Sequence, residues 1–435
     1  MDSASLLPDR RPFIGCIADD VTGATDLAIN LAQGGVRVVQ LLGVPSAGLL
    51  NEVAAYDAVV IALKTRSIPA EQAIDRSLEA LKALQQLGVE RFYFKYCSTF
   101  DSTPDGNIGP VAEALMDALG VETTVYCPAF PRAGRTVYRG HLFVGDRLLN
   151  ESGMENHPLN PMTDADLVRV LSAQTTRSVG LVGYPTPVAN AEAVRDAIAS
   201  VGGRQAHLIV DACDDSHLES IAKAVADLRL VTGGSGLARY LPPAYVERGL
   251  LSEAAALSRA PEVAGRSLVL AGSCSTATQA QVAAAAEQMP VCRVDVGALM
   301  HEPDAEKRRI LAWAGSQDSE SPLLIASTDT PDAVRSLQAS YDPDAVATAI
   351  ETLMGSLAHR MTEHEGVRRV IVAGGETSGA VAAALEIAAL EIGPEIAPGV
   401  PWTRTIGRDP ELAVAFKSGN FGGSDFFMRA LEMLP

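Results

Sequence analysis

The stretch "FIGCIADDVTGATDLAINLAQ", residues 13–33, joins an apolar run to a run in which apolar residues recur at helical spacing. The first run predicts a buried strand, and the second predicts a helix that starts near Ala24, after a turn at Thr22 and Gly23. Between them, "ADDVTGATD" places three acids in nine residues. A helix cap accounts for one acid, or two with the helix dipole. The stretch therefore predicts a strand–turn–helix unit of an α/β fold that carries more charge than its turn requires.

The same alternation continues along the chain. Short apolar runs are separated by alanine-rich helical periods such as residues 69–88. The runs that we interpret as strands are "FIGCIA", "VRVVQLL", "DAVVIAL", "RFYFKYC", "TTVYC", "SVGLVGY" and "HLIVDAC", followed by "SLVLAG", "VCRVDV", "PLLIAS" and "RVIVA". Strands that alternate with helices imply βαβ units, so the sequence predicts mainly parallel sheets flanked by helices.

The length predicts two domains, because 435 residues exceed what one hydrophobic core usually organises. Residues 241–266 contain prolines and a helical insert but no strand, and a new strand–loop–helix unit follows them. We therefore expect a first domain at residues 1–245 and a second at residues 262–435, each a mainly parallel sheet flanked by helices, with a cleft between them.

Composition excludes several classes of protein. A formal charge of −18 argues against a nucleic-acid partner, which lysine and arginine would have to neutralise. The chain has no run of ~18 apolar residues and no secretion signal, so we expect no membrane partner. Cys16, Cys97 and Cys274 lie in or beside apolar runs, where reduced thiols behave as small hydrophobes. A cytoplasmic protein is predicted. No HxxxH or CxxC spacing indicates a metal site, so the metal ligands stay unknown.

Candidate ligand-binding residues follow the strands of the first domain, where open α/β sheets bind ligands. Asp19 and Asp20 are adjacent at a strand end and repel each other unless a hydroxyl, a cation or a metal bridges them. We favour a binding site over a simple cap. In "ALKTRSIP", residues 62–69, Arg66 follows another strand. That segment is either a solvated strand end or part of a local positive pocket.

A third loop of the first domain follows an aromatic strand, in "FYFKYCSTFDSTPDGNIG". Lys95 lies within that strand and would be buried unless it faces a cleft. The hydroxyl-rich loop beyond it is either ordinary, since such residues bond their own backbone, or a site for a hydroxylated carboxylate. His157, in a proline-rich loop, is either structural or directed toward the substrate. "TGGSGLA", residues 232–238, is interpreted as a turn.

Three glycine- and hydroxyl-rich loops characterise the second domain. They are "AGSCSTATQAQ", "GGETSGAVAAAL" and "KSGNFGGSDFF". Two of them run from a strand into a helix, so that free helix amides could cradle phosphates; the alternative is a tight glycine turn. Neither GxxxxGK[ST] nor a GxGxxG after a strand is present, so both standard nucleotide fingerprints are missing. Three loops of this design nevertheless favour a nucleotide triphosphate.

Taken together, these motifs resemble the four-carbon acid sugar kinase family. The similarity spans about Phe13 to Phe427 and includes "CPAFPRAGRTVYRGHLFVG", "NHPLNPMTD" and "GPEIAPGVPW", in the family's order. The two motifs "CPAFPRAGRTVYRGHLFVG" and "NHPLNPMTD" most resemble the 3-oxo-tetronate kinase branch. The resemblance implies an N-terminal domain that binds the sugar acid, a C-terminal domain that binds ATP, and transfer of the γ-phosphate to the terminal, 4-hydroxyl group. Phosphoryl transfer of this kind usually uses Mg²⁺.

The predicted residues fall into three sets. The acid is expected to be held by Asp19, Asp20, Thr22, Arg66, Lys95, Ser98, Thr99, Asn107 and His157. ATP is expected to be held by Ser273, Ser275, Gly374, Gly375, Glu376, Thr377, Ser378, Gly379, Ser418, Gly419 and Asn420. Our hypothesis is that Asp20 receives the proton of the substrate hydroxyl, with Asp101 as the second candidate.

Other functions stay open at this point. D-threonate or D-erythronate could be the substrate instead of the 3-oxo acid. A nicotinamide-dependent sugar-acid dehydrogenase also suits two α/β domains, although the missing GxGxxG counts against it. A non-catalytic sensor that closes on a sugar acid is a third possibility. A homodimer would be unsurprising for two large domains.

Overall fold

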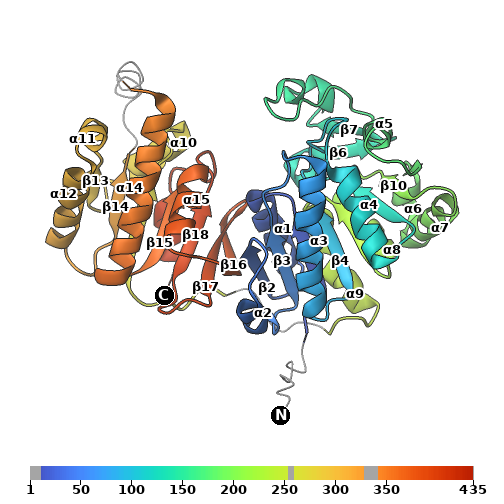
Figure 1. The fold of residues 1–435 in the computed structure, drawn as a ribbon. Coiled ribbons are helices and arrows are strands. Elements are labelled where there is room, and N and C mark those ends of the chain that lie inside the picture. The colour runs from blue at the N-terminus through green and yellow to red at the C-terminus, as the bar shows by residue number, and fades with distance from the viewer. Residues whose placement is uncertain (1–10, 253–258, 328–340, 435) are drawn as a thin grey trace, which may run out of the picture. The chain divides into compact units, whose positions relative to one another are not determined.

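The structure is a computed structural model that describes residues 11–252, 259–327 and 341–434. The chain divides into two compact units, Met1–Ser258 and Arg259–Pro435, which we call unit 1 and unit 2. Both are α/β, with mainly parallel strands flanked by helices, so the predicted fold class is confirmed (Figure 1). Among the described residues, no helix combines the length and the hydropathy needed to cross a membrane.

The sheet of unit 1 has the strand order β2-β3-β1-β4-β11-β5-β10-β9, and its strands are parallel. These strands are β1 (Ile14–Ala18), β2 (Val38–Leu42), β3 (Ala58–Ala62), β4 (Arg91–Lys95), β5 (Thr124–Cys127), β9 (Val179–Val182), β10 (His207–Val210) and β11 (Leu230–Gly233). β1 lies between β3 and β4, so the direction of winding reverses beside it. Such a switch point is where open α/β sheets bind ligands, beyond the carboxyl ends of the strands.

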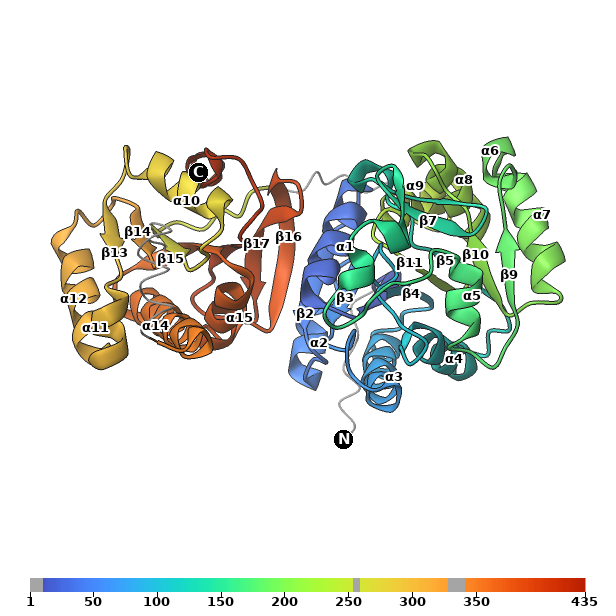
Figure 2. The same ribbon diagram turned by 90° about the horizontal axis from the view of Figure 1, so that it is seen from above.

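Helices cover both faces of this sheet (Figure 2). α3 packs against α4 on one face, and α8 packs against α7 and α9 on the other. The helices are α1 (Val21–Gln33), α2 (Ala47–Val53), α3 (Ala70–Gln86), α4 (Ile108–Leu119), α5 (Leu167–Ser172), α6 (Thr186–Ala189), α7 (Ala191–Gly202), α8 (Asp215–Val225) and α9 (Leu241–Glu247). A small antiparallel sheet of β6 (Arg135–Tyr138), β7 (His141–Val144) and β8 (Arg147–Leu148) is separate from the main one.

Two local predictions for unit 1 are wrong. α1 begins at Val21, so Thr22 and Gly23 lie in its first turn and do not form a turn before it. Asp20 is the N-cap, and its carboxylate accepts a hydrogen bond from the Gly23 amide at 3.0 Å, which starts the helix three residues early. In the predicted turn at residues 232–238, Thr232 and Gly233 instead end β11, and only the residues after them turn. β11 was missed because just two of its four residues, Leu230 and Val231, are apolar.

The sheet of unit 2 has the order β13-β14-β12-β15-β18-β17-β16. The strands are β12 (Arg266–Ala271), β13 (Val291–Arg293), β14 (Leu323–Ala326), β15 (Val367–Ala373), β16 (Ala389–Ala397), β17 (Val400–Ile406) and β18 (Ala413–Lys417). The strands from β13 to β18 in this order are parallel, whereas β17 and β16 add antiparallel pairs that the sequence analysis did not anticipate. The predicted strand "VCRVDV" is shorter than expected, since Val296 already starts a helix.

The helices of unit 2 pack on both faces of its sheet. α14 packs against α15 on one face, and α10 packs against α16 on the other (Figure 2). They are α10 (Thr276–Ala285), α11 (Val296–His301), α12 (Pro303–Ser316), α14 (Pro343–His364), α15 (Gly375–Ala384) and α16 (Phe426–Glu432).

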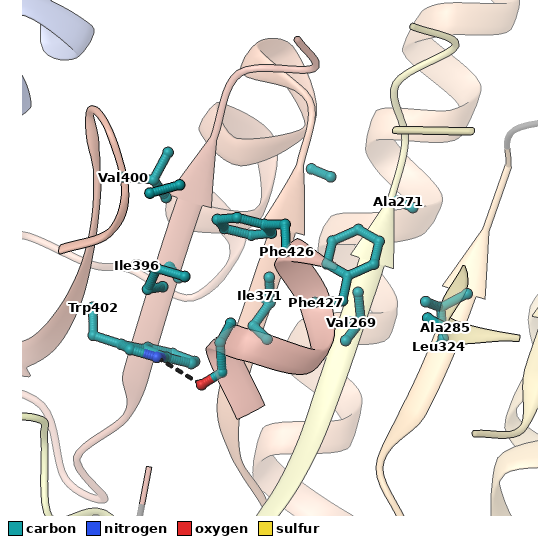
Figure 3. Close-up of a cluster of buried hydrophobic side chains, with 14 of the residues drawn as sticks. Val269, Ala271, Ala285, Leu324, Ile371, Ile396, Val400, Trp402, Phe426 and Phe427 are labelled. Carbon is teal, nitrogen blue, oxygen red and sulfur yellow. Dashed lines mark hydrogen bonds between the residues drawn. The ribbon is translucent and has the colours of Figure 1, made fainter. Parts of the chain in front are cut away.

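The core under α10 and α16 fixes the C-terminal end of the chain. Val269, Ile371 and Trp402 from the sheet pack with Phe426 and Phe427 (Figure 3). The Trp402 indole is fully buried, and its Nε1 donates to the Ala430 carbonyl at 2.9 Å, which satisfies its polar edge. This core anchors the loop between β18 and α16 at its far end.

Candidate functional site

A charge cluster lies where β1 and β3 of unit 1 end. The Arg66 guanidinium grips Asp19 with two hydrogen bonds, Nε to Oδ2 at 2.8 Å and Nη2 to Oδ1 at 2.9 Å. Nη2 also bonds Asp20. The backbone brings these groups together, because the Thr65 amide donates to the Asp19 carbonyl at 2.8 Å. The repulsion between adjacent acids is thus offset by a cation, one of the three bridges that the sequence analysis required.

Asp19 is buried, and burial raises the pKa of its carboxyl, while the bonds and charge of Arg66 act in the opposite direction. Planar, bidentate pairing of this kind suits an arginine in a partly dry site. Arg66 is therefore committed to the carboxylates of its own chain, and Lys64 beside it is exposed. The alternative of a solvated strand end applies to Lys64 and not to Arg66.

Lys95 is a second cation at the same edge of the sheet, and it is buried at the end of β4. Its Nζ donates to the Tyr96 carbonyl at 2.7 Å, the one hydrogen-bond partner that it has among the described residues. A Cβ added at Gly23 would lie 2.8 Å from this Nζ and 2.2 Å from Asp20 Oδ1. Gly23 is thus required because the Lys95 ammonium and the Asp20 cap both approach it closely. Lys95 is the cation with protons to spare for a ligand.

The loop after β4 reaches the same cluster. Asp101 Oδ2 lies 4.0 Å from Arg66 Nη1, and Thr99 Oγ1 donates to Asp101 Oδ1 at 2.5 Å. Asn107 is buried and uses its amide nitrogen to hold the carbonyls of Thr65 and Ile68, at 2.7 and 3.0 Å. Asn107 therefore fixes the segment that carries Arg66.

Within the described chain, the remaining predicted residues of unit 1 make no hydrogen bond to the side chains of Asp19, Asp20, Arg66 or Lys95. Ser98 is half-buried and Thr22 is exposed. His157 Nδ1 accepts from the Asn160 amide at 3.0 Å, so it shapes its own loop. That loop reaches the segment of Arg66 through Asn160, whose Nδ2 donates to Ser67 Oγ at 3.0 Å.

Two residues near this cluster were missed. Asp26, the third acid of the opening stretch, accepts a hydrogen bond from Ser235 Oγ, and burial raises the pKa of Asp26. Lys95 and Asp20 both act on Asp26 electrostatically. Ser235 follows β11, the missed strand beside β4. The available signal was the spacing within the helix, which puts Asp26 about one turn beyond Gly23, on the same face.

Unit 2 contains a cavity of about 350 Å³ at the carboxyl ends of β12, β14 and β15. Its wall is made by Gly272, Ser273, Cys274, Val296, Ser327, Pro343, Val346, Ala347, Ile350, Glu351, Gly374, Gly375, Glu376 and Thr377. Apolar side chains of α14 form one side. Residues from the loops before α10 and α15 form the other, so two of the three predicted loops meet here.

Glycine is needed where these two loops touch. Gly374 has φ +135°, a region that side chains rarely adopt, and its amide donates to the Lys417 carbonyl at 2.9 Å. A Cβ at Gly272 would lie 2.1 Å from Thr377 Oγ1. The backbone can therefore come close to a ligand at this wall, as in phosphate-binding turns.

The third predicted loop, residues 418–420, is not part of the cavity wall but lies against it. A Cβ at Gly419 would lie 2.1 Å from Ser273 Oγ, and Ser275, the N-cap of α10, donates to the Gly419 carbonyl at 2.7 Å. Ser418 and Asn420 are exposed. Of the other predicted residues, Gly379 is exposed on α15, and the buried Ser378 hydroxyl has no partner within the described chain.

Lys417 is a further residue that the predicted set omitted. It ends β18, it is 2% exposed, and burial lowers the pKa of its ammonium to about 8. The described residues contain no carboxylate within ion-pair distance of it. Nor do residues 11–252, 259–327 and 341–434 hold any group of three or more histidine, cysteine or acidic side chains placed to bind a metal ion.

Comparison with known proteins finds two domain models along the chain. A family model described as a sugar-binding N-terminal domain matches residues 14–241, and one described as a nucleotide-binding C-terminal domain matches residues 268–427. The chain is 51% identical over 433 residues to a 3-oxo-tetronate kinase of Pseudomonas fluorescens and 50% identical over 429 residues to one of Cupriavidus necator, with 98% of each chain covered.

A solved structure is also similar. The crystal structure of a Haemophilus influenzae protein superposes with a TM-score of 0.87 at 42% identity, over 97% of this chain and 100% of that one. The two domain models, the full-length identity and the motifs in their order agree on one family. The chain belongs to the four-carbon acid sugar kinases.

Proposed function

We propose that the protein is an ATP-dependent kinase that phosphorylates the 4-hydroxyl of 3-oxo-tetronate. The observation that carries this proposal is about 50% identity, over nearly the whole chain, to relatives named 3-oxo-tetronate kinase. The structure supports it with a cation-bearing cluster in unit 1 and a glycine-lined cavity in unit 2. The first suits a short polyol acid, and the second suits a nucleotide.

In unit 1, Lys95 is the residue that we propose to hold the substrate carboxylate. Its ammonium is buried and has a single partner in the described chain, whereas Arg66 is already engaged by Asp19 and Asp20. Burial makes a charge-assisted bond to a carboxylate stronger than it would be in water. Arg66 then acts on the acidic residues: it fixes the orientation of Asp19 and Asp20 toward the hydroxyl groups of the substrate.

The base that we propose is Asp20. Its carboxylate is held in place by the Gly23 amide and by Arg66, but it is more exposed than Asp19, with a side chain 26% exposed against 4%. As the O4–P bond forms, the 4-hydroxyl proton passes to Asp20 and the bond between the γ-phosphorus and its bridging oxygen breaks, which releases ADP. Asp101, bonded to Thr99 at the edge of the cluster, is the second candidate.

In unit 2, the phosphates of ATP are proposed to lie against Ser273 and residues 374–377. The adenine ring is proposed to lie against the apolar side chains of α14. Mg²⁺ usually binds phosphates through one or two carboxylates and several waters. Glu351 and Glu376 on the cavity wall fit that requirement, although the described residues offer no larger acidic cluster. When bound, Mg²⁺ neutralises charge on the transferring phosphate.

A panel of four-carbon acids tests the proposal. Release of ADP from ATP is measured by a coupled assay with 3-oxo-tetronate, D-threonate and D-erythronate, and without any acid. We expect turnover that depends on the acid and is fastest with the 3-oxo acid. Fastest turnover with threonate or erythronate would reassign the substrate. No turnover with any acid would favour a sensor, and a parallel fluorescence titration with a nicotinamide cofactor tests the dehydrogenase.

We also propose a cytoplasmic location, which the six free cysteines support, because disulfides persist mainly in oxidising compartments. A homodimer stays a prediction, and sedimentation of the full chain tests it.

A further inference from the structure

One face of α10 holds the loop that follows β18 by its carbonyl oxygens. Ser275 Oγ and Thr278 Oγ1 donate to the Gly419 carbonyl at 2.7 and 2.8 Å. Gln281 Nε2 lies 2.9–3.0 Å from the carbonyl oxygens of residues 421–423. The three side chains are spaced three residues apart, so successive turns of one helix face grip the whole loop.

Lys417 is the fourth side chain that holds this loop. Its Nζ donates to the carbonyls of Ser418 and Gly419, each at 3.0 Å, and to Thr278 Oγ1 at 3.2 Å. An ammonium group has three protons, and here all three are used. Lys417 is therefore not free to bond a phosphate directly, and any role in ligand binding has to act through the loop.

The position of these carbonyls determines where the amides point. In a trans peptide, the carbonyl oxygen of one residue and the N–H of the next lie on opposite sides of the chain. When the Ser418 and Gly419 carbonyls face Lys417, the N–H groups of Gly419 and Asn420 face away from it. Neither of these N–H groups has an acceptor among the residues that the structure describes. Gly419 also lies against Ser273 of the cavity wall.

We propose that Lys417 is a positioning residue for the phosphates of the nucleotide: it holds the loop so that the amides of Gly419 and Asn420 are presented to them. This inference rests on the proposed kinase function, because it requires a polyphosphate ligand at the cavity of unit 2. Free backbone amides held in a rigid loop bind anions well, since they lose little freedom on binding.

Two variants and one control test the inference. Lys417→Met removes the ammonium. Thr278→Val removes one hydroxyl from the same hydrogen-bond network, while the side chain keeps nearly the same shape. Thr362→Val is the matched control: within the described chain, the hydroxyl of this buried threonine of unit 2 bonds only the His359 carbonyl of its own helix, at 3.0 Å. Binding of adenosine, ADP and ATP is measured by calorimetry, together with KM for ATP and for the acid.

We expect Lys417→Met to weaken ATP and ADP binding about tenfold or more, as for the loss of hydrogen bonds to a charged group. Adenosine binding and KM for the acid should not change, and the control should match the wild type. The inference is overturned if both variants bind ATP with normal affinity, or if the affinity for adenosine falls as much as the affinity for ATP. If Lys417→Met fails to fold, the ATP affinity of Thr278→Val alone decides whether the inference holds. If the wild type binds no nucleotide at all, the proposed function itself fails.

Discussion

Lys95 in unit 1 and Lys417 in unit 2 occupy the same place in their sheets, yet their surroundings differ. Each is the last residue of its strand, each is 2–3% exposed, and each donates to the carbonyl of the next residue. Lys95 is near carboxylates, since its charge acts on Asp19 and on Asp26. Lys417 is surrounded by carbonyl and hydroxyl oxygens, and burial lowers its pKa to about 8.

The two lysines differ in the source of their counter-charge, which bears on the ligand proposed for each unit. In unit 1, carboxylates supply counter-charge to both Arg66 and Lys95, which suits a ligand with a single carboxylate and several hydroxyls. In unit 2, the described residues stabilise the charge of Lys417 with carbonyl and hydroxyl oxygens and with the Phe426 ring, whose centroid is 5.7 Å from Nζ, but with no carboxylate. An arriving polyanion would supply the missing counter-charge. A buried charge without a counter-ion costs free energy, and that cost is relieved when an anion binds.

The largest effect on stability is expected for Arg66→Met in unit 1. It leaves Asp19 buried without its partner, so we expect the free energy of unfolding to fall by about 3 kcal/mol or more. Unfolding in urea is followed by circular dichroism. Both tryptophans, Trp313 and Trp402, belong to unit 2, so their fluorescence monitors that unit.

The double variant Asp19→Asn, Arg66→Met is the control for this prediction. It should recover part of the lost stability, because the unpaired charge is gone. A double variant as unstable as Arg66→Met alone would show that Arg66 acts through packing and not through its charge.

The next largest effect is expected for the base. Asp20→Asn keeps a good N-cap for α1 but cannot accept a proton, so kcat should fall ~10²-fold while the Kd for ATP is unchanged. Rapid-quench kinetics measures the chemical step directly. If kcat falls ~10²-fold in Asp101→Asn but not in Asp20→Asn, Asp101 and not Asp20 is the catalytic base.

A matched glycine pair sharpens the comparison between the units. Gly23→Ala would crowd Asp20 and Lys95, and Gly419→Ala would crowd Ser273. Overpacking costs about 1–3 kcal/mol, so a KM increase of about tenfold is expected in each case. Gly23→Ala should raise KM for the acid only, and Gly419→Ala should raise KM for ATP only.

The control for the glycine pair is Gly315→Ala, because a Cβ at this exposed position of α12 meets no atom within 4 Å. Its kinetics should match those of the wild type. If either active-site variant raised both KM values equally, the assignment of one ligand to each unit would be contradicted.

The last effect is a pH dependence specific to unit 2. The pKa of Lys417 in the folded protein, about 8, lies below the ordinary lysine value of 10.5. The ammonium is therefore present below pH 8 and is lost as the pH rises through 8. If only the charged form holds the loop, ATP affinity should fall above pH 8, with a limiting slope of about tenfold per pH unit.

Titration of ATP binding between pH 6.5 and 9.5 checks this prediction. Lys417→Met should show no such decline, and binding of the sugar acid should not share the wild-type profile. A decline of equal size in Lys417→Met would assign the pH dependence to another group.

Much of the fold could be predicted because buried strands and amphipathic helices leave a local pattern. The runs that became β1 and β3 are uniformly apolar, and the helical period of α3 is evident in residues 69–88. β16 and β17 were missed, because they are antiparallel strands whose positions depend on a partner rather than on an alternating helix. α1 was placed three residues late, because a cap is formed by a side chain whose direction depends on its neighbours.

The order of residues along the chain is enough to predict that acids and cations follow the strands of one sheet, whereas glycines and hydroxyls follow the strands of the other. Only the tertiary structure decided which of them pair. Arg66 and Asp19 are 47 positions apart and meet because β1 and β3 are adjacent parallel strands. Lys417 and Thr278 meet because α10 packs beside the loop after β18. Pairing across such separations depends on strand order, which no local pattern contains.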